Sequence, residues 1–169
     1  MTPTILFANT TIAAREKVKF DEAAARKMFA AATAEDAAKV LAPLGYDIEH
    51  EEHIVAKRLA QVMNTFFELC PDEQVKEFVR KVSHTPSAAP TPLYLKGEAR
   101  KYLLYIEEYF GKGVNELPTL KSATSFDLEM FLNWFIIRLE ELRVVKAILM
   151  GKKLGIPNAA LRAIIRGEK

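Results

Sequence analysis

The sequence has a single cysteine, little excess charge and no long apolar run. The lone Cys70 excludes an internal disulfide and any zinc site built from several cysteines, and it indicates a reducing, intracellular setting. The 24 lysines and arginines nearly balance the 22 aspartates and glutamates, which excludes a strongly basic nucleic-acid-binding protein. No segment approaches the roughly 20 apolar residues of a membrane-spanning helix, and the N-terminus does not resemble a signal peptide. We therefore expect a cytoplasmic protein that meets a membrane only through partner proteins.

The residues that are abundant predict a helical protein. The chain has 169 residues, half of them hydrophobic, and its charged and aromatic content is typical of a folded domain. Alanine, leucine, glutamate and lysine dominate the periodic segments, and the 7 glycines and 8 prolines fall mostly between them. We find no hairpin turn and no alternating strand pattern. The predicted class is all-α, a multi-helix bundle of short and long helices.

Capping residues and apolar spacing place the individual helices. The expected helices cover residues 5–18, 22–32, 34–44, 49–70, 71–83, 94–110, 125–153 and 158–166. Asp21 and Thr33 are predicted N-caps, Pro71 is expected in the first turn of its helix, and Thr124 or Ser125 is expected to cap the longest one. A stripe formed by Tyr102, Tyr105 and Tyr109 is either core or a protein-binding face, and core is favoured because most periodic aromatic residues are buried.

A proline-rich segment divides the chain. Residues 84–92 include three prolines and no large apolar side chain, which predicts an extended linker between an N-terminal lobe, 1–83, and a C-terminal lobe, 93–169. Charge is also unevenly distributed. From Arg138 onward there are eight basic residues and three glutamates, so this part carries +5 and the preceding part −3. Such an asymmetry can orient docking to a partner.

Few residues offer catalytic chemistry. His50 and His53 are weak candidates for metal ligands, because their spacing of three can place two imidazoles on one helix face beside acidic residues. The metalloprotease pattern needs a spacing of four, and a solvated helix start with acidic residues at the positive end of the dipole is the favoured interpretation of the segment. Cys70 is interpreted as a structural thiol. There is no glycine-rich phosphate loop and no carboxylate dyad. We therefore expect no catalytic residue, no cofactor and no enzymatic activity, with a metal-dependent enzyme centred on the two histidines as a weaker alternative.

The segment 141–157, ELRVVKAILMGKKLGIP, resembles the closing segment of the C subunit of archaeal and bacterial vacuolar-type ATPases, which is related to the d subunit of the eukaryotic enzyme. That family typically shows an acidic residue, a helix of basic and apolar residues, Gly-Lys, and a break before a short helix. The matching positions are Glu141, Arg143, Lys146, Ile148, Gly151, Lys152, Gly155 and Pro157. Val144 departs from the family, which usually has asparagine at that position.

The N-terminal part is similar in a looser way. Asn9, Ile12 and Arg15 resemble a degraded form of the family's Asn-Ala-Arg-Ile-Arg opening, and residues 34–46 resemble a helix ending in Thr-Gly-Tyr. The proline-rich segment after Ser83 departs, because the family usually carries an Asp-x-x-Asn element near it. The family has three similar helical lobes and about twice this length, so the resemblance implies a shortened or diverged member with lobes of that type.

The resemblance implies a non-catalytic component of the central rotor stalk. In the family this protein is a socket that seats the rotor shaft on the membrane-embedded proteolipid ring, in proton or sodium transport coupled to ATP. The residues expected to contact a partner are Glu141, Arg143, Lys146, Lys152 and Arg162. For each of the basic ones a solvated helix face is an equally good interpretation. The alternative function is a helical adaptor or regulatory module unrelated to the motor, with a partner helix or peptide along the tyrosine stripe.

Overall fold

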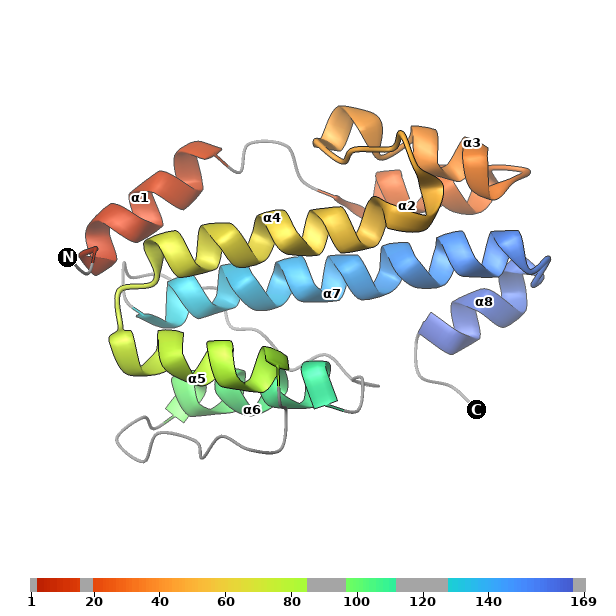
Figure 1. Ribbon diagram of the computed structural model, residues 1–169. Coiled ribbons are helices and arrows are strands. Elements are labelled where there is room, and N and C mark those ends of the chain that lie inside the picture. Colours follow the sequence, from red (N-terminus) through yellow and green to blue (C-terminus); the bar gives the residue numbers. More distant parts are fainter. Residues whose placement is uncertain (1–2, 16–19, 85–96, 112–127, 166–169) are drawn as a thin grey trace. The chain divides into compact units, whose positions relative to one another are not determined.

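The computed structural model describes residues 3–15, 20–84, 97–111 and 128–165 of the chain. All of the regular secondary structure within these ranges is helical, which confirms the predicted all-α class. The α-helices are α1 (Ile5–Arg15), α2 (Glu22–Ala30), α3 (Ala34–Lys39), α4 (Ile54–Leu69), α5 (Glu73–His84), α6 (Gly97–Gly111), α7 (Leu128–Lys153) and α8 (Asn158–Ile165) (Figure 1). None of the helices in the described part of the chain is both long and apolar enough to cross a bilayer.

The chain forms two compact units, and each combines segments from both halves of the sequence. Unit 1 comprises Met1–Arg15 and Met63–Leu139, and unit 2 comprises Glu16–Val62 and Glu140–Lys169. Two of the three boundaries between the units therefore fall within α4 and α7, and the third follows Arg15 at the end of α1. The division at a linker spanning 84–92 stays a prediction, because residues 85–96 lie outside the described ranges, and His84 belongs to the end of α5.

The predicted N-caps Asp21 and Thr33 are confirmed, and the predicted position of Pro71 is wrong. Asp21 accepts a hydrogen bond from the Ala24 amide at 2.8 Å, and Thr33 accepts one from the Asp36 amide at 3.1 Å. Pro71 was expected within the first turn of α5, but it lies before the helix. Asp72 occupies the capping position, where its Oδ1 accepts the amides of residues 74 and 75 at 2.9 and 3.0 Å. A carboxylate satisfies two otherwise unbonded amides there, which a proline cannot do.

The helix expected from residue 49 starts later. Asp47 Oδ1 accepts the Glu49 amide at 3.1 Å, and residues Glu51–His53 form a 3₁₀ turn before α4 begins at Ile54. A short polar side chain that bonds its neighbouring backbone competes with the α-helical ladder, which explains the delay. Upstream, the segment expected as one helix to residue 44 is divided into α3 and a 3₁₀ helix, Ala42–Leu44, that ends at Gly45 with φ of +92°. The predicted helix ends at residues 16–18, 94–96 and 124–127 lie outside the described ranges.

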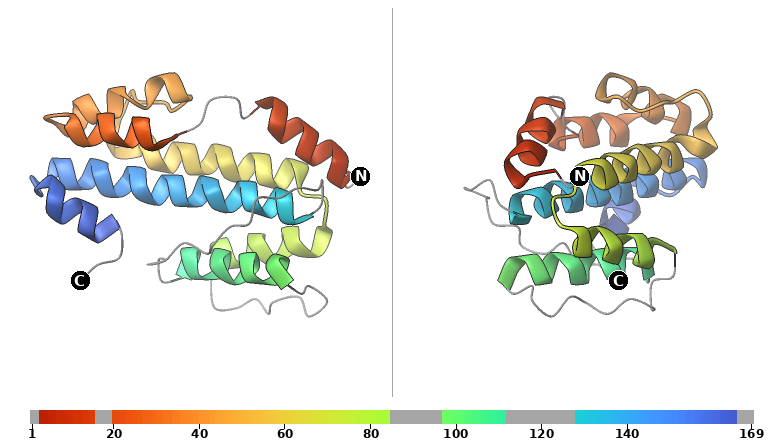
Figure 2. Two further views of the ribbon diagram at one scale, coloured as in Figure 1. Left: turned by 180° about the vertical axis from the view of Figure 1, so that it is seen from behind. Right: turned by 60° about the vertical axis from the view of Figure 1, so that its left-hand side comes forward.

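Aromatic side chains from α4 and α7 form the centre of unit 1. The ring centroid of Phe66 lies 5.5 Å from that of Phe131 and 4.4 Å from that of Phe135. Phe131 also contacts Trp134 at 5.6 Å. In the same unit α5 packs along α6 (Figures 1 and 2). The buried residues of these two helices are Val75, Phe78, Val79, Val82, Tyr102, Leu103, Tyr105 and Ile106. Tyr102 and Tyr105 of the predicted tyrosine stripe are therefore core residues, whereas Tyr109 is half-buried.

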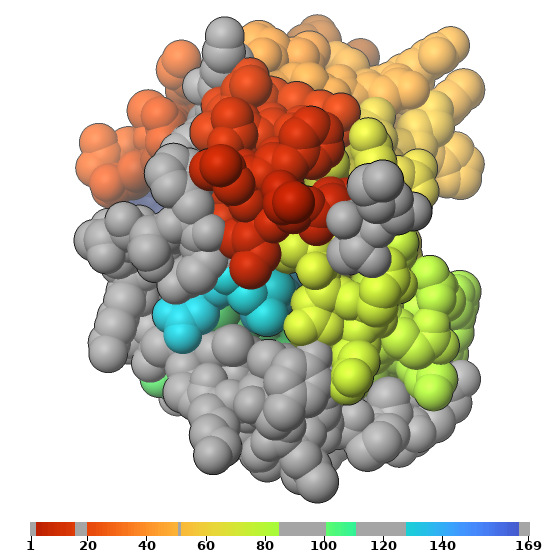
Figure 3. All heavy atoms as spheres, turned by 90° about the vertical axis from the view of Figure 1, so that its left-hand side faces the viewer, coloured from red at the N-terminus to blue at the C-terminus, as the bar shows by residue number. Residues whose placement is uncertain are grey.

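Helix α1 attaches to unit 1 by one face. Its buried residues are Ala8, Asn9 and Ile12. Arg15 forms an ion pair with Glu68 of α4 at 3.3 Å, and both side chains are about half exposed. Figure 3 shows α1 as the red surface. Leu6 and Phe7 of this helix are 61% and 57% exposed. Asn9, Ile12 and Arg15, which carried the N-terminal resemblance, thus take part in attaching α1.

In unit 2, α2 packs against α3, and the first half of α4 and the second half of α7 supply most of the remaining core. Its large buried residues are Met28, Phe29, Leu41, Ile54, Leu142, Val145, Ile148, Leu149 and Leu161. The aromatic ring of Tyr46, itself buried, lies under the Arg58 guanidinium, with 5.1 Å from the Arg58 Cζ atom to the ring centroid. Unit 2 contains the whole of segment 141–157, so the candidate site is described within it.

Candidate functional site

The segment that carries the resemblance folds as a helix, a break and a second helix, which we call the closing element (residues 141–165). Gly155 has φ of +72°, a left-handed conformation that favours glycine. The Ile156 amide donates to the Gly151 carbonyl at 2.9 Å, and the Gly155 amide donates to the Lys152 carbonyl at 3.2 Å. These two bonds are the Schellman pattern of a helix end, and Pro157 then precedes α8. The predicted stop and restart is confirmed.

Gly151 permits the two helices of the closing element to approach closely. A Cβ atom at this position would lie 2.7 Å from Cδ1 and 2.8 Å from Cδ2 of Leu161. Leu161 is 1% exposed, so its side chain fills the space that a larger residue at position 151 would occupy. Close packing of this kind fixes the angle of α8 on α7, because a packed interface resists small displacements.

Lys152 joins the closing element to the end of α2. Its Nζ atom donates to the backbone carbonyls of Phe29 at 2.5 Å and Ala31 at 2.8 Å, and to Oδ1 of Asn158 at 3.0 Å. The side-chain Nδ2 atom of Asn158 also donates to the Phe29 carbonyl, at 2.9 Å. A lysine at the C-terminal end of a helix satisfies carbonyl groups that lack intrahelical partners and complements the helix dipole. Lys152 therefore has an internal role in unit 2.

Three further residues expected at a partner interface make internal contacts. The Arg143 guanidinium pairs with Glu140 at 2.6 Å and donates to the Ile165 carbonyl at the end of α8, at 2.8 Å. Arg162 places its guanidinium 4.8 Å from the ring centroid of Phe29. Glu141 is buried and accepts a hydrogen bond from a tyrosine hydroxyl of the same unit. These contacts account for the charges without a partner, although a partner contact for them stays a prediction.

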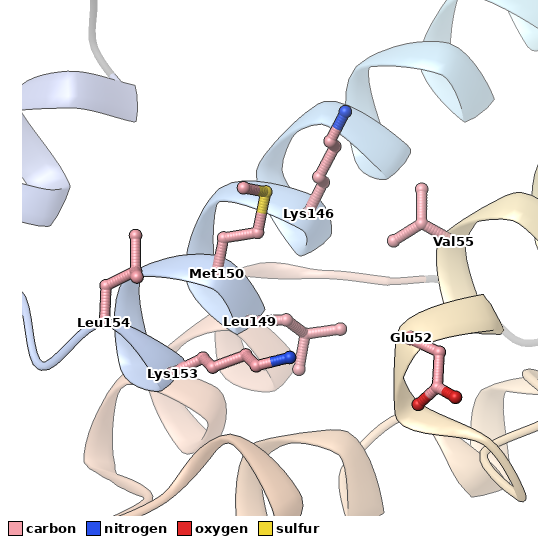
Figure 4. Close-up of a pocket in the computed structure, with 7 residues that line it drawn as sticks. All are labelled: Glu52, Val55, Lys146, Leu149, Met150, Lys153 and Leu154. Atoms are coloured by element: carbon pink, nitrogen blue, oxygen red, sulfur yellow. The ribbon is translucent and has the colours of Figure 1, made fainter.

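The fifth expected residue, Lys146, is exposed and lines a groove of about 410 Å³ on unit 2. We call it the α7 groove, and its lining residues are Glu52, Val55, Lys146, Leu149, Met150, Lys153 and Leu154. Figure 4 shows the α7 side chains on one side of the space and Val55 and Glu52 on the other. Leu149 is nearly buried, whereas Met150 is 50% and Leu154 70% exposed. Large apolar side chains exposed to this degree and gathered in one groove are typical of a binding surface.

The charges of the groove are mostly positive. Lys146 and Lys153 are both exposed, and neither forms an ion pair within 4 Å among the described residues. Among the described residues that line the groove, Glu52 is the one with an acidic side chain. A hydrogen bond from its own backbone amide lowers the pKa of the Glu52 carboxyl, and the electrostatic influence of the nearby His53, His50 and Lys153 lowers it further. Glu52 is therefore ionised at neutral pH, and the described lining carries a net charge of +1.

His50 and His53 are close to one another at the surface. Their ring centroids are 6.3 Å apart and edge to face, and His53 Nε2 lies 4.0 Å from the Glu52 carboxylate. Within the described ranges no group of three or more histidine, cysteine, aspartate or glutamate side chains is arranged to hold a metal ion. The pair thus finds no third ligand of these types in that part of the chain. The metal hypothesis for the two histidines gains no support from the geometry.

Cys70 is buried at the end of α4, and its Sγ lies 3.4 Å from the Asp72 carbonyl. Burial raises the pKa of the thiol to about 12, so at neutral pH the residue is an uncharged thiol. Nucleophilic chemistry requires the thiolate. This environment supports the interpretation of Cys70 as a structural residue.

Sequence reasoning did not single out Glu52, Val55, Met150, Lys153 or Leu154 as site residues. A signal was present, because Lys146 interrupts an otherwise apolar series on a long helix. Such an interruption marks the point where a helix face returns to solvent. The other half of the groove comes from residues 52–55, about 90 positions earlier, and no local pattern connects the two.

Comparison of the chain with protein-family models, with curated proteins and with solved structures found no match in any of the three.

Proposed function

We propose that the protein is a non-catalytic central-stalk component of a vacuolar-type rotary ATPase, or a shortened relative of one, that links the rotor shaft to the proteolipid ring. The sequence resemblance of residues 141–157 carries the proposal. The observation that supports it most is the construction of this segment as a braced helix–break–helix with an exposed groove along α7. The role suits a peripheral protein that reaches the membrane through the ring.

A protein that transmits torque has to be stiff, and the closing element is held at several points. Gly151 and Leu161 pack without space between them, Lys152 bonds the end of α2, and Arg143 bonds the end of α8. These contacts connect residues that are 10 to more than 120 positions apart. Close-packed helices with such connections resist deformation more than a single hydrogen-bonded helix does.

The positive C-terminal part gives the proposal its electrostatic basis. Four of the five residues that the resemblance implied for partner contacts make contacts inside unit 2, although Arg162 is exposed, and Lys146 is the one that lines the α7 groove. We therefore expect the contact with the motor to be centred on the groove, with the engaged residues positioning it. Attraction between exposed charges falls as salt rises, so ionic contacts of this kind are sensitive to ionic strength.

The experiment is a retention assay with the full chain and two purified targets, the rotor-shaft proteins and the proteolipid ring, at about 0.05 M and 0.5 M salt. The proposal predicts that both targets retain the wild-type chain at low salt and release part of it at high salt. Lys146→Glu should weaken retention, and Lys27→Glu, the same charge change at an exposed position of α2, should not. Retention of the chain by neither target at low salt would contradict the proposal.

A further inference from the structure

The α7 groove has an ordered arrangement of apolar and basic side chains. Lys146, Leu149, Met150, Lys153 and Leu154 occupy positions i, i+3, i+4, i+7 and i+8, so all five share one face of α7. The two lysines are seven residues apart, which corresponds to two helical turns and about 10 Å along the axis. Both lysines are exposed, and a lysine can lay its aliphatic stem on apolar surface while its ammonium group stays in water. Figure 4 shows the Lys153 ammonium directed toward the side of Glu52.

From this arrangement we propose that the α7 groove binds an amphipathic helix of a partner protein, whose apolar stripe covers Met150 and Leu154 and whose carboxylates, seven residues apart, pair with Lys146 and Lys153. The inference rests on the proposed function in one respect, because it specifies the chemistry of the partner at the same docking face. It adds the secondary structure, the charge sign and the spacing of the partner's contact residues.

The charge of the partner follows from the cost of burying ammonium groups. A helix laid on Met150 and Leu154 would also cover the stems of Lys146 and Lys153 and partly dehydrate their charges. A buried charge without a counter-ion is strongly unfavourable, whereas a carboxylate placed at hydrogen-bond distance offsets that cost. Glu52 offsets at most one of the two positive charges. An acidic partner is therefore favoured over a neutral or basic one.

The shape of the groove favours a helix over a small molecule or a nucleic acid. Small-molecule sites bury most of their ligand, but the walls of this groove include side chains that are half or more exposed. Single-stranded nucleic acids are bound by aromatic stacking surfaces, and the described lining residues include no aromatic side chain. A groove that follows one helix face fits the recognition mode in which anchors at i, i+3, i+4 and i+7 of a partner helix enter an apolar channel.

A synthetic peptide tests the inference with the full chain. The probe has three identical seven-residue repeats, each with two leucines forming a stripe, one glutamate beside the stripe, and alanine and glutamine elsewhere. Because the repeats are identical, successive glutamates are seven residues apart in either orientation and in any register. Two control peptides replace the three glutamates with glutamine or with lysine. Fluorescence anisotropy measures the dissociation constant of each.

We expect the glutamate peptide to bind the wild-type chain more tightly than the glutamine peptide, by roughly 2- to 30-fold for two exposed ion pairs. The double variant Lys146→Glu, Lys153→Glu should reverse the order and prefer the lysine peptide. Lys27→Glu should behave as the wild type. The opposite results overturn the inference: no measurable binding, equal binding of the glutamate and glutamine peptides, or unchanged preference in the double variant. Self-association of the wild-type chain that the double variant abolishes would also overturn it, because a second copy would then be the occupant.

The peptide experiment and the retention assay can fail independently of one another. If the peptides bind as predicted but the shaft and the ring retain nothing, the groove is an acidic-helix site and the motor assignment is wrong. If the shaft or the ring retains the chain and the peptides show no charge preference, the motor assignment stands and the groove inference is wrong.

Discussion

The Tyr46 hydroxyl donates a 2.6 Å hydrogen bond to the carboxylate of Glu141, and both side chains are buried in unit 2. The two residues are 95 positions apart, and both belong to segments that carried the resemblance. Glu141 begins the closing element, so this bond fixes one end of it to the segment that follows Gly45. The acidic residue at this position thus has a structural role that requires no partner.

Tyr46→Phe should lower the free energy of unfolding by about 1.5 to 3 kcal/mol, the range for a buried hydrogen bond to a charged group. The substitution keeps the ring that lies under Arg58, so the loss reports the hydroxyl and not the aromatic packing. Urea unfolding of the full chain measures it. Tyr46→Leu, which removes the hydroxyl and the ring together, should lower the free energy of unfolding more than Tyr46→Phe does. Equal stability of Tyr46→Phe and the wild type would show that the bond contributes little.

The effect of Gly151→Ala on the free energy of unfolding should change sign with the residue at position 161. In the wild-type background the new Cβ meets Leu161, and overpacking of about 1 to 3 kcal/mol exceeds the ~0.5 to 1 kcal/mol that alanine gains over glycine in a helix. In a Leu161→Ala background the contact is absent, so the same substitution should stabilise. Thermal or urea unfolding of the four proteins gives the coupling free energy. Additive effects would show that the two residues do not constrain each other.

Lys152→Met should destabilise unit 2 by about 1 to 3 kcal/mol, because it removes an ammonium that donates to two backbone carbonyls and to Asn158. Hydrogen exchange should rise at the end of α2 and the start of α8. The matched control is the neighbouring Lys153→Met, an exposed residue without these bonds, whose effect should stay within about 0.5 kcal/mol. Equal losses in the two variants would contradict the assigned role of Lys152.

Cys70 should make the stability of the fold sensitive to alkaline pH. Its thiol has a pKa of about 12 in the folded chain against an ordinary value of 9.0, so the unfolded chain releases this proton first. The contribution to stability is fully present below pH 9.0 and is lost progressively as the pH rises toward 12. Cys70→Ala should therefore show a shallower decline of stability above pH 9 than the wild type. Identical alkaline slopes would show that the thiol titrates alike in both states.

Local features of the fold could be predicted from the sequence, and distant contacts could not. The caps at Asp21 and Thr33 and the break at Gly155 depend on residues within a few positions, and the structure confirms all three. Lys152 is an example of a residue whose contacts could not be predicted from the sequence. Its charge suggested a partner contact, but its bonding partners at the end of α2 are more than 120 positions away. Only the folded chain reveals that this lysine is engaged and that Lys146 is exposed.

The same limit applies to the candidate site. The five α7 residues of the groove share one face at helical spacing, which a sequence can indicate. The opposite wall, Glu52 and Val55, depends on where the turn before α4 is placed. That turn begins α4 five residues later than the apolar pattern predicted, because Asp47 bonds the backbone locally. Because the start of α4 was predicted five residues too early, the sequence did not indicate that Glu52 and Val55 form a wall of the groove.

Hydrogen exchange of the full chain, with and without the purified rotor-shaft proteins, tests most directly whether the α7 groove docks onto the motor. We predict that the complex protects amides in residues 51–55 and 146–154, the two walls of the groove, and that the double variant Lys146→Glu, Lys153→Glu loses this protection while keeping its fold. Protection confined to other segments, or no change on mixing with the shaft proteins, would contradict that docking.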